Sequence, residues 1–155
     1  FTVIAILAIG LTAYGIYSLI SRSQQQADLV KVKTFSENFI RDYSTYQSSS
    51  SVEYNKRISN YILPAYKKSF LEKYELGPVK SLDQIDLNNY SKYISSEINI
   101  TPMSEANTYD VVISYDAKVF DATISSIPST ENNKIELTVT KNKDQYYITT
   151  FDYIE

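Results

Sequence analysis

The spacing of apolar side chains changes twice along the chain. Residues 1–20 form an apolar run, residues 27–76 carry apolar side chains three or four positions apart, and residues 93–153 tend to carry them at every second position. These periods predict a membrane-length helix, then amphipathic helices, and then strands with one buried face. We therefore expect helices first and a sheet afterwards.

The run Phe1–Ile20 predicts a transmembrane helix. It holds no charged residue and ten strongly apolar ones, and twenty helical residues span roughly 30 Å, the thickness of a bilayer's hydrocarbon core. Ala13-Tyr14-Gly15 has the small residues of a signal-peptide cleavage site, but the apolar run exceeds the roughly 7–15 residues of a secretory leader. We therefore expect a retained anchor at residues 1–20 and a connection at residues 21–26.

Residues 27–155 are expected to form a single domain on one side of the membrane. The first residue is Phe rather than Met, so we expect a preceding segment whose charges contribute to the orientation of the span. A large domain that follows a single N-terminal span is normally translocated. We therefore expect residues 27–155 outside the cytoplasm.

Three helices are expected between residues 27 and 76. The first ends in the polar tract that begins at Gln47. Ser50-Ser51-Val52-Glu53 fits a capping box, so the second helix spans about residues 51–63. Pro64 cannot continue that helix and starts a third, which ends at Leu76 before Gly77-Pro78. The side chains expected to pack inward are Leu29, Val32, Phe35, Phe39, Tyr43 and Tyr46, then Tyr54, Ile58, Tyr61 and Ile62, and then Tyr66, Phe70, Leu71 and Tyr74.

Four strands are expected after a mixed loop segment at residues 79–90. They are Tyr93–Thr101, Tyr109–Ile124, Lys134–Lys141 and Gln145–Tyr153, with a loop at residues 125–133 and a turn at residues 142–144. About sixteen residues is long for a strand, so we expect a bend or bulge within the second one. The expected buried faces are Ile94, Ile98 and Ile100 in the first strand, Tyr109, Val111, Ile113, Tyr115, Ala117 and Val119 in the second, and Ile135, Leu137 and Val139 in the third.

Helices followed by hairpin-connected strands predict an α+β fold, with helices packed on one face of a curved antiparallel sheet. Among small folds of this content, the nuclear-transport-factor-2-like cone fits the order of elements best. A cystatin-like or other α+β roll is the alternative.

Composition excludes several functions. The chain has 15 basic and 18 acidic residues and a formal net charge of −3, so no electrostatic basis exists for nucleic-acid binding. It has neither Cys nor His, which removes the usual thiol nucleophiles, thiolate metal ligands and imidazole bases. Glycine occurs only at positions 10, 15 and 77, so no glycine-rich phosphate loop is present. We expect no enzyme activity and no cofactor.

The acidic residues do not suggest a catalytic or metal site. Asp110 and Asp116 fall on the polar face of the long strand, Asp144 falls in a turn, and Asp83 and Asp86 lack the spacing of a calcium loop. Tyrosines could also serve as contact points for a partner protein. Helical or strand spacing instead places four of them in the expected core: Tyr54, Tyr61, Tyr74 and Tyr115.

Small residues line one face of the predicted span. Ala5, Ala8, Thr12 and Gly15 are three or four positions apart, and small side chains let membrane helices approach closely. Small residues are common in such spans, and no strict G-x-x-x-G is present. We keep this face as a candidate surface for self-association, and we expect a homo-oligomer.

The order of anchor and helices resembles a known family. The stretches ENFIRDYSTY (Glu37–Tyr46) and YNKRISNYILPAY (Tyr54–Tyr66) are similar to TcpC-type conjugal transfer proteins of Gram-positive mobile elements. Those proteins resemble the bitopic VirB-type scaffold subunit of type IV secretion systems. The resemblance implies a single-pass cell-membrane protein with a nuclear-transport-factor-2-like domain on the cell-wall side, which contacts other channel subunits. It implies no catalytic or binding residues.

Three classes of function follow. The chain is interpreted as a non-enzymatic scaffold of a secretion or conjugation channel, with a membrane-tethered ligand-binding or sensory module as the alternative and an anchored enzyme as a third class. An apolar cavity lined by polar groups would favour the ligand-binding module. A filled interior and oligomers would favour the scaffold.

Overall fold

The computed structural model describes the backbone of residues 2–47, 51–73, 90–120 and 127–155, and the side chains of residues 23–47, 52–70, 90–120 and 127–155. Two compact units make up the chain, Phe1–Lys31 and Val32–Glu155. Helix α1 (Thr2–Ser44) forms the first unit and supplies the first helix of the second.

The first unit is helical from Thr2 onward. The side chains of residues 1–22, and with them the face Ala5, Ala8, Thr12 and Gly15, lie outside the described part. Within the part that is described, no helix is both long enough and apolar enough to cross a membrane. The span at residues 1–20 and its small-residue face stay predictions.

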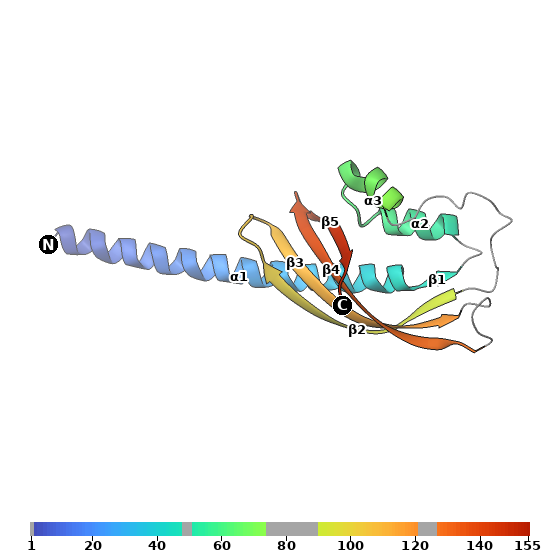
Figure 1. Ribbon diagram of the computed structural model, residues 1–155. Helices are drawn as coiled ribbons and strands as arrows, with labels where there is room; N and C mark the ends of the chain where they lie inside the picture. The colour runs from blue at the N-terminus through green and yellow to red at the C-terminus, as the bar shows by residue number, and fades with distance from the viewer. Residues whose placement is uncertain (1, 48–50, 74–89, 121–126) are drawn as a thin grey trace. The chain divides into compact units, whose positions relative to one another are not determined.

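The second unit is built on a five-stranded antiparallel sheet whose strands follow the order of the sequence. Figure 1 shows that the sheet is strongly curved, with helices on its concave side. Its strands are β1 (Tyr46–Gln47), β2 (Tyr90–Pro102), β3 (Thr108–Phe120), β4 (Ser129–Asn142) and β5 (Gln145–Tyr153). The α+β class and the curved antiparallel sheet that the sequence predicts are therefore confirmed.

The core lies between the concave face of the sheet and the helices α1, α2 (Ser51–Ser59) and α3 (Lys67–Lys73). The predicted inward face of β3 is confirmed from Tyr109 to Ala117, because every second side chain there is buried. Burial of apolar side chains is the main favourable term in folding. The largest side chains with less than 2 % exposure are Phe39, Ile40, Ile58, Ile62, Ile113, Ile135, Leu137, Ile148 and Phe151.

The helices end earlier than the sequence predicts. α1 ends at Ser44, and Tyr46 lies in strand β1 rather than on the helix. α2 ends at Ser59, because residues 61–63 leave the helix to pair with β5: the Ile148 amide donates to the Tyr61 carbonyl (2.8 Å) and the Leu63 amide to the Ile148 carbonyl (3.2 Å). The backbone hydrogen bonds of residues 61–63 to β5 thus outweigh the helical spacing of their apolar side chains.

The third helix also differs from its prediction. Pro64 starts a short 3-10 helix, η2 (Pro64–Tyr66), and α3 follows it directly. Phe70 is buried as expected, but Tyr66 is 46 % exposed, so its predicted burial is wrong. The 3-10 turn has three residues per turn, which rotates Tyr66 away from the face that Phe70 occupies. Residues 74–89, which include Tyr74, and the side chain of Leu71 lie outside the described part.

The bulges lie in the neighbours of β3 and not in β3 itself. The β2–β3 register shifts between Tyr93 and Ser95, so Ile94 is the extra residue of a β-bulge. A bulge exchanges the two faces of a strand, and Ile94 is therefore 49 % exposed although the sequence places it inside. A second shift in the β4–β5 pairing leaves Thr149 as the extra residue in β5.

Strand β4 begins at Ser129, so the predicted loop at residues 125–133 is wrong over its second half. β3 is continuous to Phe120, and the pairs Val119–Ser129 and Ala117–Glu131 extend the ladder along it. Backbone pairing with β3 forms this part of the strand, because its inward side chains are polar. Residues 121–126 lie outside the described part.

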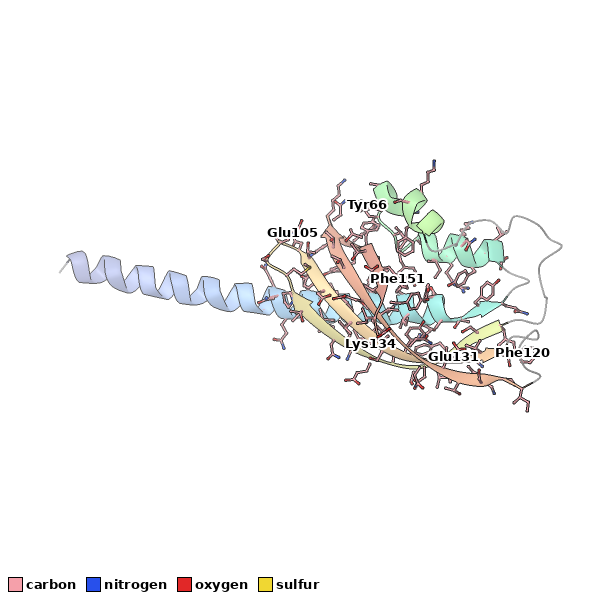
Figure 2. The ribbon with its side chains drawn as sticks, in the orientation of Figure 1. Tyr66, Glu105, Phe120, Glu131, Lys134 and Phe151 are labelled. Atoms are coloured by element: carbon pink, nitrogen blue, oxygen red, sulfur yellow. The ribbon has the colours of Figure 1, made fainter. Side chains whose placement is uncertain are left out.

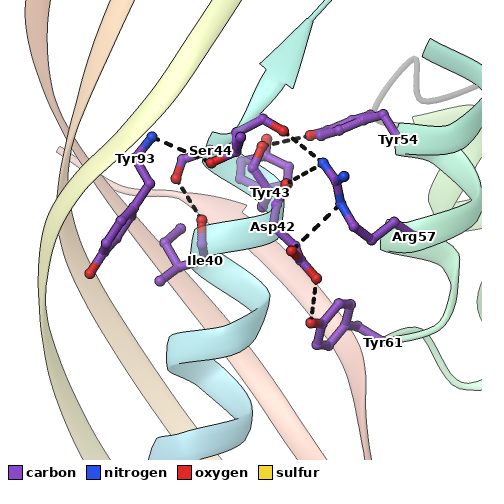
Figure 3. A network of polar contacts seen from close by, with 9 residues as sticks. Ile40, Asp42, Tyr43, Ser44, Tyr54, Arg57, Tyr61 and Tyr93 are labelled. Atoms are coloured by element: carbon purple, nitrogen blue, oxygen red, sulfur yellow. Dashed lines mark hydrogen bonds and ion pairs between the residues drawn. The ribbon is translucent and has the colours of Figure 1, made fainter. Parts of the chain in front are cut away.

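The C-terminal turn of α1 is held by side chains from α2 (Figure 3). The last four carbonyls of a helix have no intrahelical partner. The Arg57 guanidinium donates from Nη2 to the carbonyls of Thr45 (2.8 Å) and Asp42 (3.3 Å). The Tyr54 hydroxyl donates to the Tyr43 carbonyl at 2.8 Å. A cation at this position also complements the negative end of the helix dipole.

Strand β2 holds the same turn from the other side. The Ser91 hydroxyl donates to the Ser44 carbonyl at 2.8 Å, and the Ser44 hydroxyl donates to the Ile40 carbonyl at 2.6 Å. The Tyr93 amide donates to the Thr45 hydroxyl at 3.4 Å (Figure 3). The end of α1 is thus fixed between α2 and β2, and it brings side chains from all three elements together.

Asp42 adds a further link between α1 and the segment after α2. The Tyr61 hydroxyl donates to Asp42 Oδ2 at 2.6 Å, and Asp42 Oδ1 lies 3.6 Å from Arg57 Nε. Burial and this hydrogen bond raise the pKa of Tyr61. The ion pair is partly exposed, and such pairs add little stability. Its effect is to orient Arg57 toward the carbonyls.

Residues 27–155 should fold cooperatively on their own, and Val111→Asp should unfold them. Val111 is completely buried, and an unpaired buried charge is expected to lower the free energy of unfolding by more than about 4 kcal/mol. Ser114→Asp, on the exposed face of the same strand, is the matched control and should leave the thermal midpoint nearly unchanged. A folded Val111→Asp protein would show that the inward face is assigned incorrectly.

Tyr54→Phe should lower the free energy of unfolding by about 1 kcal/mol, because it removes one hydrogen bond to a helix-terminal carbonyl and keeps the ring. Urea denaturation of residues 27–155 measures the change. Tyr66→Phe, at an exposed position on η2, is the control and should be neutral. Equal stability of the two variants would contradict a capping role for Tyr54.

Candidate functional site

The concave face of the sheet changes from apolar to polar along its strands. In β4 the inward positions run from Val139, Leu137 and Ile135, all fully buried, to Asn133 and Glu131. Each of these residues lies directly opposite an inward residue of β3. The apolar part packs against the helices, and the polar part lies at the end of the sheet where β4 begins.

Aromatic rings fill the apolar part. Phe151 of β5 lies at the centre, with its ring centroid 5.1 Å from Tyr43, 6.3 Å from Phe39 and 5.9 Å from Phe70. Figure 2 shows Phe151 on β5, on the side of the sheet where the helices lie. Tilted and edge-on pairs of this kind add to the stability that burial supplies.

A cavity of about 260 Å³ remains at the polar end of the concave face. Three small side chains, Ser44, Ser91 and Ala117, form part of its wall where larger side chains would fill the space. Four tyrosines from four different elements surround them. The residues that line it are Tyr43 and Ser44 of α1, Tyr54 of α2, Ser91 of β2, Tyr115, Ala117 and Val119 of β3, Glu131 and Asn133 of β4, and Tyr153 of β5.

Burial favours the neutral form of three tyrosines in the cavity. Burial raises the pKa of Tyr43, Tyr54 and Tyr115 well above the usual value, and repulsion from a second phenolate at Tyr153 would raise it further. The hydroxyls of Tyr43 and Tyr153 are hydrogen-bonded to each other. A phenol acts as a base or nucleophile only after it loses its proton. These hydroxyls can therefore bind by hydrogen bonds but are poorly suited to proton transfer.

Glu131 supplies the carboxylate of this cavity. It faces the concave side opposite Ala117, and its charge contributes to the raised pKa of Tyr115. No second acid lines the cavity among the residues that the structure describes. In the same described ranges, no group of three acidic side chains is placed to hold a metal ion. The arrangement offers hydrogen-bond acceptors and one negative charge.

Two other hollows lie at the edges of the sheet. One of about 170 Å³ lies between α3 and β5 and is lined by Tyr66, Phe70 and Phe151, among others. The other, of about 430 Å³, lies beside β1 and β2, and its lining includes Arg57 and Lys92. The first combines three aromatic side chains with polar ones, and the second combines two tyrosines with polar and cationic side chains.

The acidic residues and tyrosines that the sequence analysis considered have structural positions where the structure describes them. Asp116 lies on the convex face, where its Oδ2 accepts a hydrogen bond from Ser95 Oγ (2.9 Å) and its Oδ1 one from the Asn132 amide. Asp144 lies in the β4–β5 turn. Asp83 and Asp86 lie outside the described part. Tyr54 and Tyr115 are buried as predicted, whereas Tyr61 is half-buried.

The sequence alone does not single out Glu131 or the small residues Ser44 and Ser91. The segment around Glu131 has no apolar alternation, so it is interpreted as a loop there. The signal that could have placed it is the length of β3, since a thirteen-residue strand needs a partner of similar length in a hairpin. Pairing along the whole of β3, from Thr108–Thr140 to Val119–Ser129, carries β4 back to Ser129.

No protein-family model and no curated relative matches the chain. Solved structures do resemble it. An IcmL-like type IV secretion system protein from Legionella pneumophila is 13% identical, with 81% of this chain and 91% of that protein covered and a TM-score of 0.59. CagV, a VirB8 homologue of the type IV secretion system from Helicobacter pylori, is 9% identical, with 74% and 89% covered and a TM-score of 0.57.

A third similar structure is an NTF2-like protein involved in plasmid conjugation. It is 17% identical, with 79% of this chain covered and a TM-score of 0.56. The chain spans 47% of that protein's length. At these identities the comparisons concern the fold alone. They show that the fold of this chain, with helices on the concave side of a curved antiparallel sheet, is similar to that of an NTF2-like protein and a VirB8 homologue.

Proposed function

We propose that the chain is a non-enzymatic, membrane-anchored scaffold subunit of a type IV secretion channel that transfers DNA in conjugation. The observation that carries this proposal is the fold of residues 32–155, which resembles an IcmL-like secretion protein, a VirB8 homologue and a conjugation protein. The sequence stretches Glu37–Tyr46 and Tyr54–Tyr66 support the same assignment through their resemblance to TcpC-type transfer proteins of Gram-positive elements.

The side-chain chemistry supports binding rather than catalysis. The polar groups at the end of α1, such as Arg57, Tyr54 and Ser91, hold the helix against its neighbours. Burial keeps Tyr43, Tyr54 and Tyr115 neutral, and Glu131 has no second acid beside it in the cavity among the described residues. A domain of this kind acts by contacts with other subunits of the channel and with further copies of itself. No cofactor and no direct contact with the transferred DNA is required.

The sequence of residues 1–20 supports anchoring in the cell membrane, with residues 27–155 on the cell-wall side. An uncharged apolar segment of this length is favourable in a bilayer. The face Ala5, Ala8, Thr12 and Gly15 would then bring copies of the span together. Such tethering would strengthen weak contacts between the domains, because it raises the effective concentration of the domains.

The ligand-binding alternative has less support. Small-molecule sites usually have volumes of roughly 300–1,000 Å³, whereas the cavity of the concave face has about 260 Å³. Phe39, Phe70 and Phe151 fill the remainder of the interior. The larger hollow, of about 430 Å³, lies beside β1 and β2 at the edge of the sheet. On the concave face itself, a partner's side chain fits the available space better than a metabolite does.

The full chain should sediment with membranes and resist carbonate extraction, because residues 1–20 supply the apolar length that a span needs. Residues 27–155, expressed from the same host, are the control and should remain in the supernatant. Recovery of a mature protein that begins after Gly15 would contradict a retained anchor.

The full chain should crosslink as multimers in membranes, and residues 27–155 should be mostly monomeric at micromolar concentration. Gly15→Leu should weaken crosslinking and leave insertion intact, because the larger side chain separates helices that pack through small residues. Ala13→Leu makes a similar enlargement away from the face Ala5, Ala8, Thr12 and Gly15, and should have little effect. If the full chain crosslinks only as a monomer beside its native partners, the assembly role is wrong.

A further inference from the structure

Glu131 is placed unusually for a charged residue, because it projects from the concave side of the sheet. Along β4 it follows the buried residues Ile135 and Leu137 on the same face. Figure 2 shows Glu131 toward the end of the sheet where Phe120 lies and away from Glu105. Among the residues that the structure describes, no hydrogen bond or ion pair engages its carboxylate. The carboxylate therefore remains exposed at the edge of a tyrosine-lined cavity.

Other groups of the cavity offer hydrogen-bond acceptors beside this carboxylate. The Tyr54 hydroxyl donates its proton to the Tyr43 carbonyl, so the lone pairs of its oxygen remain available. The hydroxyls of Tyr43 and Tyr153 share one hydrogen bond, which leaves further acceptor capacity on both oxygens. Because burial keeps the phenols of Tyr43 and Tyr54 neutral, these groups attract a donor without adding charge.

Arg57, the cation stacked on the Tyr54 ring, is already engaged by other groups. Arg57 lies 5.6 Å from the centre of the Tyr54 ring. Its guanidinium donates to carbonyls at the end of α1 and faces the Asp42 carboxylate. Its charge is therefore directed toward the helix end, and the negative charge of Glu131 is left for a group from outside.

We propose that this cavity binds the side chain of a Lys or Arg residue from a partner subunit, with Glu131 as the counter-ion and the tyrosine hydroxyls as further acceptors. A volume of about 260 Å³ admits one long side chain. The mouth is accessible, since Tyr153 is 58 % exposed and Glu131 is exposed. Charge-assisted hydrogen bonds of this type are stronger than neutral ones. The inference rests on the proposed scaffold role and names the chemistry of one contact.

The experiment is an NMR titration of the full chain in detergent micelles, with methyl-labelled alanine. Ala117 lies in the wall of the cavity, and Ala106 lies in the β2–β3 turn at the other end of these strands. The probes are N-acetyl-arginine amide, N-acetyl-lysine amide and methylguanidinium, with N-acetyl-glutamine amide as a neutral control. The cationic probes should shift the Ala117 methyl signal saturably and leave Ala106 unchanged.

Two matched variants distinguish an effect of the Glu131 carboxylate from an effect of the overall charge of the protein. Glu131→Gln should weaken binding of the cationic probes about tenfold or more. Glu136→Gln removes the same charge from an exposed position on the convex face of the same strand and should leave binding unchanged. Dispersed alanine methyl signals with an unshifted Ala106 in the unliganded variants would show that both remain folded.

Two results would overturn the proposal. One is an Ala117 signal that does not move with any cationic probe, or that moves equally in Glu131→Gln. The other is a response to free methylguanidinium without a response to either amino-acid amide, which would exclude a side chain carried on a polypeptide. Neither result depends on crosslinking of the full chain. The cavity contact can therefore fail while the scaffold role stands, and the reverse also holds.

Discussion

The way in which the end of α1 is held between α2 and β2 depends on donors for its last carbonyls. A helix that ends inside a domain must find donors for its last carbonyls, because unpaired buried polar groups are costly. Arg57 and Tyr54 supply donors from α2, and Ser91 supplies one from β2. These bonds fix three elements that are distant in sequence, and the same three elements contribute walls to the cavity. The helix cap and the candidate site are thus parts of one arrangement.

The sequence predicts those features that depend on one periodic pattern. The alternation in β3 identifies its buried face from Tyr109 to Ala117, because a sheet with one buried face requires apolar residues at every second position. It does not reveal where the pattern is interrupted. Ile94 looks like part of a buried face, yet the bulge at that residue turns it outward. Tyr46 continues a helical spacing, yet it pairs with Ser91 in the sheet.

The sequence predicts the candidate site less well than the fold, because the residues of the site come together only through long-range pairing. Tyr54 and Tyr115 are recognisable as core residues, but the sequence does not show that their hydroxyl ends reach a common cavity. Glu131 acquires its position from the pairing with Ala117, and the inward residues of that part of β4 are polar. Backbone hydrogen bonds define the strand there without help from apolar alternation.

The concave face has two parts, of which the apolar one stabilises the domain and the polar one is available to bind a partner's side chain. The aromatic packing around Phe151 supplies the buried area that holds helices and sheet together. That packing ends at the small side chains of Ser44, Ser91 and Ala117, which leave the cavity open. The hydrogen bonds at the end of α1 hold part of the cavity wall in place. A pocket whose walls are held in this way loses little entropy when it is filled, which favours binding by preorganisation. The position of Glu131 at its mouth then selects the charge of the group that enters.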